Sequence, residues 1–468
     1  MILKTSSNFN SGFVSFATGT GIFAIYFMIS SMTLAAPVIA GLYHLQPQVT
    51  GFIIQAHLIG AVLFLLPAAK FGDLVGHGKI LCAGGFIFAI SSFLCSISPT
   101  EFAASGLIIF RFTQGIGDAM IMASSLVLLS RKWNPEQRGE SFGLFLFAGY
   151  LGYISGLLGG GSLIDLFGWK ASFLFTVPLT VITGLAGYMI SKSDKTTFDT
   201  KTGNFDFRGM LLFGPAIILL TIGLSQIPST ISIPIILTGI IIFIMLIIHE
   251  KQIEYPLFDI SIFKNNNIFS LAILSDLLYY AGIGAISYTL STYLETARDF
   301  SSFNVALIIL PISISQGFLS PISGKLSDRI DPKYISAAGV GIVFIMLLIY
   351  SQLDLNTEII KISLIAALIG IGFALFSAPN KNAIMSSVNS DNHGNASGIA
   401  NTFEQTGNLA SIGIAAAIMT FISGSSISGS YSPEILLESI DLIFLVLAGI
   451  CLINILVILI REKSGIKN

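Results

Sequence analysis

The sequence contains few charged residues for its length. Asp, Glu, Lys and Arg make up only 10% of the 468 residues, whereas they make up about 25% of an average soluble domain. The formal net charge is −2, which argues against nucleic acid as a partner, because nucleic-acid-binding surfaces are strongly basic. A hydrophobic content of 53% and a mean hydropathy of +0.85 accompany this scarcity of charge. Together these values predict an integral membrane protein.

Cysteine and histidine are scarce too. Cys82, Cys95 and Cys451 all lie within apolar runs, so the sequence offers neither a disulfide framework nor a CxxC metal site. The five histidines are scattered, mostly near the ends of predicted helices, without the spacing of metal ligands. We therefore expect no metal and no other cofactor. A membrane-embedded enzyme would need such clustered groups, so we expect that the protein is not an enzyme.

Long apolar runs fill most of the chain. Runs of about 20 residues, bounded by charges or turn signals, predict an all-α fold with fourteen membrane spans. We place them near residues 15–42, 50–69, 80–99, 104–129, 141–163, 170–191, 208–226, 231–249, 267–291, 303–323, 334–351, 361–381, 395–421 and 438–460. The longest polar connection, residues 191–208, is too short to hold a folded domain. Any functional chemistry must therefore lie among the helices.

The positions of Lys and Arg predict the orientation of these spans. If the N-terminus lies in the cytoplasm, most of the 23 Lys and Arg residues fall on the inner side, and only Lys170, Arg298 and Lys361 fall outside. This asymmetry follows the positive-inside rule. The sequence thus predicts a multi-pass protein of the cell membrane, with both termini in the cytoplasm and membrane lipid as its surroundings.

One predicted span, residues 106–130, contains charge in its middle. Arg111, Gln114, Gly115 and Asp118 fall on one stripe of a helix that turns once in about 3.6 residues. A charge at mid-bilayer costs roughly 2.5 to 3.5 kcal/mol, so this stripe must face protein or water. We interpret Arg111 and Asp118 as a transport or proton-coupling site. The alternative is an Arg and Asp pair that serves only helix packing.

Two other acids lie inside predicted spans. Asp276 precedes Tyr279 and Tyr280, and Glu404 shares a stripe with Asn401 and Asn408. Desolvation favours the neutral form of a carboxylic acid, so both acids are candidate proton carriers in a cavity. The alternative for each is a hydrogen-bonded contact between helices.

Further polar groups within the spans are candidates for substrate contact. The side chains concerned are Gln114, Tyr279, Tyr280, Gln316, Asn380 and Asn401. For Gln316 and Asn380 in particular, hydrogen bonding between helices explains a polar residue in a span equally well.

A short motif occurs twice. AKFGDLVGHGK at 69–79 follows the second span and GKLSDRIDPK at 324–333 follows the tenth, with Asp73 and Asp328 in corresponding places. Eight helices separate the two copies, so we expect two six-helix bundles with two helices inserted between them. This predicts an N-terminal bundle at 1–192, a linker with two extra spans at 193–255 and a C-terminal bundle at 256–468. Parallel repeats of this kind are one way to build alternating access.

These features resemble the major facilitator superfamily, and specifically its fourteen-span drug:proton antiporter branch. The most specific match is to R-x-x-Q-G-x-G in the fourth span, given by Arg111, Gln114, Gly115 and Gly117. The loop after the second span is similar to the superfamily's G-x-L-x-D-x-x-G-x-x-K/R pattern. The resemblance implies gating loops formed by Asp73, Gly76 and Lys79 and, in the second copy, by Gly324, Asp328 and Arg329.

The fifth span carries a third pattern of this branch, G-x-x-x-G-P-x-x-G-G. Its glycines are Gly152, Gly156, Gly160 and Gly161, and Leu157 stands where the pattern has proline. Small residues four apart form a smooth face, so these glycines predict close helix packing. In the first span Met28 stands where the branch usually has an aspartate.

The predicted function is secondary active transport. The resemblance implies that two bundles rock about a central cavity that contains Arg111, Asp118 and Glu404, and that a proton gradient drives the cycle. We expect a monomer that exports amphipathic small molecules. The alternative is symport or uniport of a specific metabolite, lipid or peptide by the same fold.

Overall fold

The computed structural model describes residues 11–98, 103–132, 138–193, 206–225, 229–253, 260–264, 266–327, 329–388, 393–423 and 433–462. Every regular element in these ranges is helical. The elements are α1 (Ser11–Tyr43), α2 (Pro47–Val75), α3 (His77–Ile97), α4 (Ala103–Lys132), α5 (Arg138–Phe167), α6 (Lys170–Ser193), α7 (Phe207–Ser225), α8 (Ser232–Glu250), η3 (Ile260–Phe263), α9 (Asn267–Ile283), α10 (Ile286–Thr292), η4 (Tyr293–Ala297), α11 (Ser302–Ser327), α12 (Pro332–Tyr350), α13 (Ile359–Ser386), α14 (His393–Ser423) and α15 (Pro433–Ile460).

The predicted all-α membrane fold is confirmed. In the described part of the chain, thirteen helices are long and apolar enough to cross a membrane, and a shorter apolar helix covers Arg208–Leu224. Each of the fourteen ranges expected from hydropathy falls on one of these helices. The protein is therefore a multi-pass membrane protein.

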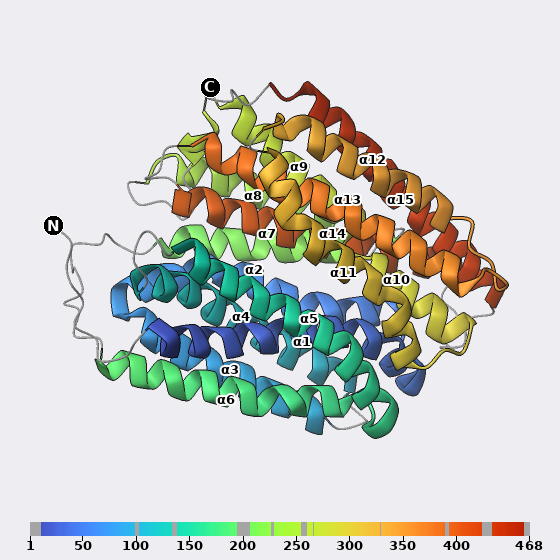
Figure 1. Ribbon diagram of the computed structural model, residues 1–468, viewed down its shortest axis with the longest axis horizontal. Helices are drawn as coiled ribbons and strands as arrows, with labels where there is room; N and C mark the ends of the chain where they lie inside the picture. The colour runs from blue at the N-terminus through green and yellow to red at the C-terminus, as the bar shows by residue number, and fades with distance from the viewer. Residues whose placement is uncertain are drawn as a thin grey trace. The chain divides into compact units, whose positions relative to one another are not determined.

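The helices form two compact units. Unit 1 comprises Met1–Ala35 and Phe52–Gly214, and unit 2 comprises Ala36–Gly51 and Pro215–Asn468. Within each unit the helices run side by side (Figure 1). The three-part division at residues 192 and 255 stays a prediction.

Glycines set the close helix contacts of unit 1. A Cβ added to Gly60 of α2 would overlap the carbonyl oxygen of Phe112 in α4, and one added to Gly115 would overlap that of His57 in α2. On another face of α4, a Cβ on Gly117 would lie 2.7 Å from the backbone nitrogen of Phe88 in α3. The two glycines of the Q-G-x-G segment therefore let α4 pack closely against two different helices.

Unit 2 is built by similar contacts. Gly339 of α12 and Gly372 of α13 face each other's backbone, and Gly407 of α14 lies against Leu277 and Tyr280 of α9. Helices α7 and α8 also pack together, because a Cβ on Gly239 of α8 would lie 3.0 Å from Leu220 of α7.

The ninth predicted span is interrupted, which hydropathy did not indicate. Helix α9 ends at Ile283, α10 begins at Ile286, and a π-helical turn, η4, completes the segment. The backbone N–H of Ala285 donates to the Ser411 hydroxyl of α14 at 2.9 Å. A side-chain acceptor on a neighbouring helix thus binds a backbone group at the break.

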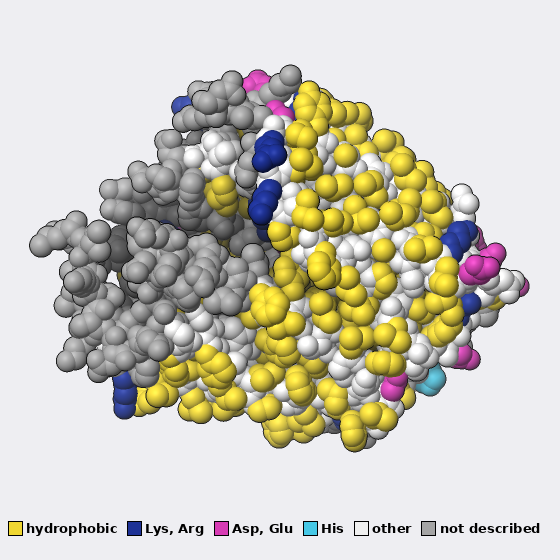
Figure 2. Space-filling view, viewed as in Figure 1, with side chains coloured by type: hydrophobic (Ala, Val, Ile, Leu, Met, Phe, Trp, Pro, Cys, Tyr) yellow, Lys and Arg dark blue, Asp and Glu magenta, His cyan; other side chains and the backbone are white. Residues whose placement is uncertain are grey.

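The outer surface of the helices is apolar. Figure 2 shows a face that is mainly hydrophobic, with few charged side chains, which lie mostly at its margins. In α8 the exposed hydrophobic side chains include Ile233, Leu237, Ile241 and Met245, each more than half exposed. Such a surface suits contact with lipid.

Candidate functional site

The charged stripe of α4 is enclosed by unit 1. Arg111 is 2% exposed and Gln114 is fully buried. The Arg111 Nη1 donates to Oε1 of Gln114 at 2.5 Å, and Nε2 of Gln114 donates to the Ser92 hydroxyl of α3 at 2.6 Å. Thr176 of α6 donates to the same Ser92 oxygen at 3.2 Å. Polar side chains of α4, α3 and α6 thus form one connected set of hydrogen bonds that holds the guanidinium in place.

Asp118, two turns along the same stripe, pairs with a histidine. Its Oδ2 lies 3.0 Å from Nε2 of His57 in α2. His57 is 1% exposed and Asp118 is 6% exposed. The other ring nitrogen of His57, Nδ1, has no hydrogen-bond partner among the described residues.

This group can change its charge by binding one proton. Arg111 and Asp118 act electrostatically on one another and on His57. With a neutral imidazole, the three side chains have a formal net charge of zero, and with a protonated imidazole the charge is +1. The three side chains are buried, so the interaction energies among these charges are larger than at a protein surface.

Unit 2 contains a second buried polar cluster. Nδ2 of Asn380 in α13 donates to Oδ1 of Asp276 in α9 at 3.2 Å and to the carbonyl oxygen of Ala272 at 3.0 Å. Nη1 of Arg461, directly after α15, donates to Oδ1 of Asn380 at 2.9 Å. Asp276, Asn380 and Arg461 are all 0% exposed. One amide therefore connects a buried carboxylate to a buried guanidinium.

Glu404 belongs to a more open part of unit 2. Its Oε2 lies 2.8 Å from Nζ of Lys381 in α13, with side-chain exposures of 19% and 41%. The hydroxyl of Tyr280 interacts with Glu404 and Ser377. Glu404 and Asp276 act on each other electrostatically, so the two acids of unit 2 belong to one charged region.

The remaining predicted substrate contacts differ from one another in their burial. Tyr279 is fully buried and stacks on Phe376 with ring centroids 3.8 Å apart. Gln316 and Asn401 are partly exposed. The structure therefore brings Asp276, Tyr280, Asn380 and Glu404 into one region, whereas Tyr279 packs into the apolar core.

The repeated loops are described only in part. Asp328 and the side chain of Asp73 lie outside the described residues. Gly76 is buried at a φ of 105°, which favours glycine, and begins the turn into α3. Lys79 and Arg329 are exposed, and Gly324 lies within α11.

The glycines of α5 form the contact with α1. A Cβ on Gly152 would overlap the Phe23 carbonyl oxygen, and one on Gly156 would overlap the Phe27 carbonyl oxygen and the Ser30 hydroxyl. Gly160 meets Ser31 in the same way, and Gly161 is buried. The two positions that depart from the antiporter pattern, Met28 and Leu157, are both fully buried.

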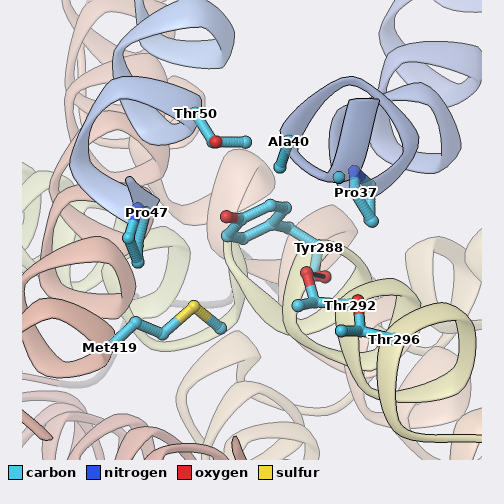
Figure 3. Close-up of a pocket in the computed structure, with 9 residues that line it drawn as sticks. Pro37, Ala40, Pro47, Thr50, Tyr288, Thr292, Thr296 and Met419 are labelled. Carbon is cyan, nitrogen blue, oxygen red and sulfur yellow. Dashed lines mark hydrogen bonds between the residues drawn. The ribbon is translucent and has the colours of Figure 1, made fainter. Parts of the chain in front are cut away.

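A small pocket lies in unit 2. Its lining includes hydroxyl and apolar groups, with no charged side chain among the described lining residues. Figure 3 shows the Tyr288 ring in the middle of the group, with Thr50 and Pro47 on one side and Met419 on another. Thr292 and Thr296 continue the lining along α10 and η4.

Several residues in these clusters were not identified as site residues from the sequence, and two of them, His57 and Arg461, hold central positions. His57 is a lone histidine within an apolar run, and that placement in a span is the signal that could have singled it out. Arg461 follows the last apolar run, where a basic residue is typical of a cytoplasmic helix end. The sequence does not indicate the partner of either residue, because Asp118 is far from His57 along the chain and Asn380 is far from Arg461.

The chain resembles curated transporters along most of its length. It is 28% identical over 359 residues to the riboflavin transporter RibZ of Clostridioides difficile, covering 77% of each chain. It is 24% identical over 429 residues to the drug efflux pump JefA of Mycobacterium tuberculosis, covering 90% of this chain and 82% of that protein. The multidrug resistance protein Stp of the same organism is 23% identical over 430 residues, covering 90% of this chain and 77% of Stp.

Solved structures share the fold. A bacterial homologue of the human lysosomal transporter Spinster, in an inward-facing and occupied conformation, matches with a TM-score of 0.69 at 12% identity, covering 96% of both chains. A peptide transporter, POT, matches with a TM-score of 0.67 at 14% identity, covering 95% of this chain and 93% of that one. The family model described as Major Facilitator Superfamily matches residues 18–412. The chain therefore belongs to the Major Facilitator Superfamily of membrane transporters, and not to a family of enzymes.

Proposed function

We propose that the protein exports amphipathic small molecules in exchange for protons, by alternating access, as a member of the fourteen-span drug:proton antiporter branch. The observation that carries the proposal is the buried His57–Asp118 pair beside Arg111, with Nε2 and Oδ2 3.0 Å apart. An imidazole can bind or release one proton, so the charge of this buried pair can change by one. The similarity to JefA, which is named as a drug efflux pump, and to Stp, which is named as a multidrug resistance protein, supports export.

Each candidate residue has a role in this proposal. Arg111 is a fixed cation whose field acts on the proton held by His57 and Asp118, and Asp276 and Glu404 carry protons in unit 2. Polar side chains contact the substrate, namely Gln114, Tyr280, Gln316, Asn380 and Asn401, and Tyr279 supports Tyr280 from the apolar core. The loops at Asp73, Gly76 and Lys79 and at Gly324, Asp328 and Arg329 gate access.

The energy source in this proposal is the proton gradient, and no cofactor takes part. A proton that crosses a membrane potential of 100 mV supplies about 2.3 kcal/mol. The protein works as a monomer in the cell membrane, surrounded by lipid, with both termini in the cytoplasm. No nucleic acid is a partner.

A second candidate function is transport of one specific metabolite. RibZ, which shares 28% identity over 77% of this chain, is named as a riboflavin transporter. A planar aromatic solute such as riboflavin and an amphipathic dye place similar demands on an apolar binding cavity. The two candidates therefore differ in their selectivity.

One experiment separates these functions. The purified protein is reconstituted in proteoliposomes, and uptake of ethidium and of riboflavin is measured with an imposed pH gradient, with its collapse by nigericin, and in both gradient directions. Dye movement against the proton flow supports drug:proton antiport. Riboflavin movement without dye movement favours the second candidate. If substrate flux is the same with and without the gradient, proton coupling is wrong.

A further inference from the structure

The side chain of Arg461 is unusual because it is buried without an ion pair to any carboxylate of the described residues. It is 0% exposed, and the hydrogen bond from its Nη1 leads to the Oδ1 of Asn380. Its Nε and Nη2 have no hydrogen-bond partner among the described residues. A buried guanidinium with unfilled donors is costly, so a nearby negative charge is needed to compensate it.

Asp331 acts electrostatically on Arg461, and a second carboxylate, Asp276, lies on the other side of Asn380. The amide donates from Nδ2 to Oδ1 of Asp276 at 3.2 Å and accepts from Arg461 on its own Oδ1 at 2.9 Å. The Asn380 amide therefore connects a carboxylate to a guanidinium, and its two hydrogen bonds polarise it in a single direction. Oδ2 of Asp276 is buried and has no hydrogen-bond partner in the described part of the chain, so it is the oxygen open to a proton.

Other charged groups among the described residues act on the two side chains. Lys381 of α13 and Glu404 of α14 act on Asp276 in opposite directions and pair with each other at 2.8 Å. On α12, Asp331 acts electrostatically on Arg461 while its side chain accepts from the backbone N–H of Lys333 at 3.0 Å. Nζ of Lys333 in turn donates to the carbonyl oxygen of Arg461 at 2.8 Å. Arg461 therefore lies between two carboxylates, Asp276 through Asn380 and Asp331 at the start of α12.

We propose that Arg461 is a positioning residue that exchanges between these two carboxylates as Asp276 binds and releases a proton. A proton from water binds to Oδ2 of Asp276, and no covalent bond of the protein breaks. The neutral acid no longer compensates the guanidinium, so Arg461 turns toward Asp331 and Asn380 is released from it. Loss of the proton reverses these steps. This inference rests on the proposed proton coupling and adds a residue and a direction of movement to it.

Four variants test the exchange: R461Q, R461K, D276N and the double variant D276N/R461Q. Lys361→Gln on the exposed start of α13 is the matched control for removing a cation. The two measurements are the melting temperature of the purified protein in detergent and the pH profile of transport in proteoliposomes. The melting temperature does not depend on transport, so it separates failure of this inference from failure of the proposed function.

The expected results are specific. R461Q lowers the melting temperature by roughly 5 °C or more, because it leaves a buried carboxylate without its cation. D276N/R461Q recovers at least half of that loss, since neither buried charge remains. R461Q shifts the midpoint of the pH profile by about one unit toward higher pH, because without the cation the Asp276 carboxyl group stays protonated to a higher pH. R461K, which keeps the charge, lies between R461Q and the wild type.

The opposite results overturn the inference. Additive losses of melting temperature in R461Q, D276N and the double variant would mean that the two charges are not coupled. A pH profile of R461Q that coincides with that of the wild type would make Arg461 a purely structural residue. If R461Q does not fold, the double variant decides: recovery of folding supports the coupling, and continued failure contradicts it.

Discussion

The imidazole of His57 and the carboxylate of Asp118 form a buried pair, with Nε2 and Oδ2 3.0 Å apart. Their helices can approach closely because Gly60 of α2 and Gly115 of α4 have no side chains, so the two backbones are in contact where the helices cross. The superfamily's Q-G segment thus has a physical role here: it brings a histidine of one helix to the charged stripe of another. In the proposed function, this pair is the group of unit 1 that binds and releases the proton.

Replacing Asp118 by Asn should uncouple transport from the proton gradient. Asn keeps an oxygen that can accept from His57, so the fold is retained, but it removes the charge that binds the proton. Gradient-driven accumulation of substrate should fall about tenfold or more, equal to about 1.4 kcal/mol or more of driving force. Exchange of substrate at equal concentrations should continue. Accumulation at the wild-type level would exclude Asp118 from coupling.

Replacing Arg111 by Ala or by Lys should show whether transport needs only its positive charge or also the planar guanidinium. Arg111→Ala leaves Oε1 of Gln114 buried without its donor, which costs about 1–3 kcal/mol of stability. Arg111→Lys keeps the charge but loses the planar guanidinium, so it should retain part of the gradient-driven flux. Lys361→Ala, at an exposed cation, is the control and should transport normally. Equal flux in Arg111→Ala and the wild type would remove Arg111 from the mechanism.

Gly115 tests whether close packing positions the pair. A Cβ at this position would overlap the His57 carbonyl oxygen, so Gly115→Ala must push α2 and α4 apart. Overpacking of this kind costs about 1–3 kcal/mol, and coupling should be lost with it. Gly341→Ala on α12 is the matched control, because no atom of the described neighbouring segments lies within 4 Å of the added Cβ. Thermal melting and gradient-driven uptake of both variants provide the comparison, and equal melting temperatures would contradict the packing role.

Local hydropathy predicts much of this fold. The fourteen apolar runs coincide with helices because the requirement to bury backbone hydrogen bonds in lipid acts on each segment separately. The burial of the Arg111 stripe follows from the same reasoning, since exposing a charge to lipid is expensive. The break after Ile283 could not be predicted, because it involves a hydrogen bond from Ala285 to Ser411, far along the chain.

Residue partners were harder to predict than residue environments. The sequence indicates that Asp118 and Asp276 need polar surroundings, but not that these are His57 for one and Asn380 with Arg461 for the other. Such pairings depend on the crossing points of helices, which are set by glycines on several segments at once. A lone histidine in an apolar run was accordingly given no role, although it contacts the most specific motif.

Lys381 and Glu404 form an accessible pair whose effect should be on transport more than on stability. Partly exposed ion pairs contribute about 0–1 kcal/mol, so Lys381→Gln should change the melting temperature little. It should slow transport, because Glu404 then acts on Tyr280 and Asp276 without a counter-charge. The swap Lys381→Glu with Glu404→Lys should restore part of the rate. Full activity of Lys381→Gln would show that the pair is dispensable.

The loop between α12 and α13 provides a test of pH-dependent stability outside the membrane spans. Oδ1 of Asp354 accepts from the Thr357 hydroxyl at 2.9 Å and from the backbone N–H of Asn356 at 2.8 Å. These hydrogen bonds, the Thr357 bond first, lower the pKa of Asp354. The Tyr293 hydroxyl donates to the Asp354 carbonyl oxygen at 2.6 Å, which connects the loop to η4.

Because the pKa of Asp354 is lowered by folding, the folded state gives up this proton more readily than the unfolded chain. The resulting stability is complete at pH values above the unfolded pKa, about 3.9, and is lost as the pH falls through the lower folded value. Asp354→Asn should therefore have a lower melting temperature than the wild type at pH 6, and the difference should shrink as the pH approaches 3. Thermal melts of both proteins across this range measure the effect. A difference that stays constant with pH would mean that the carboxylate charge does not stabilise the loop.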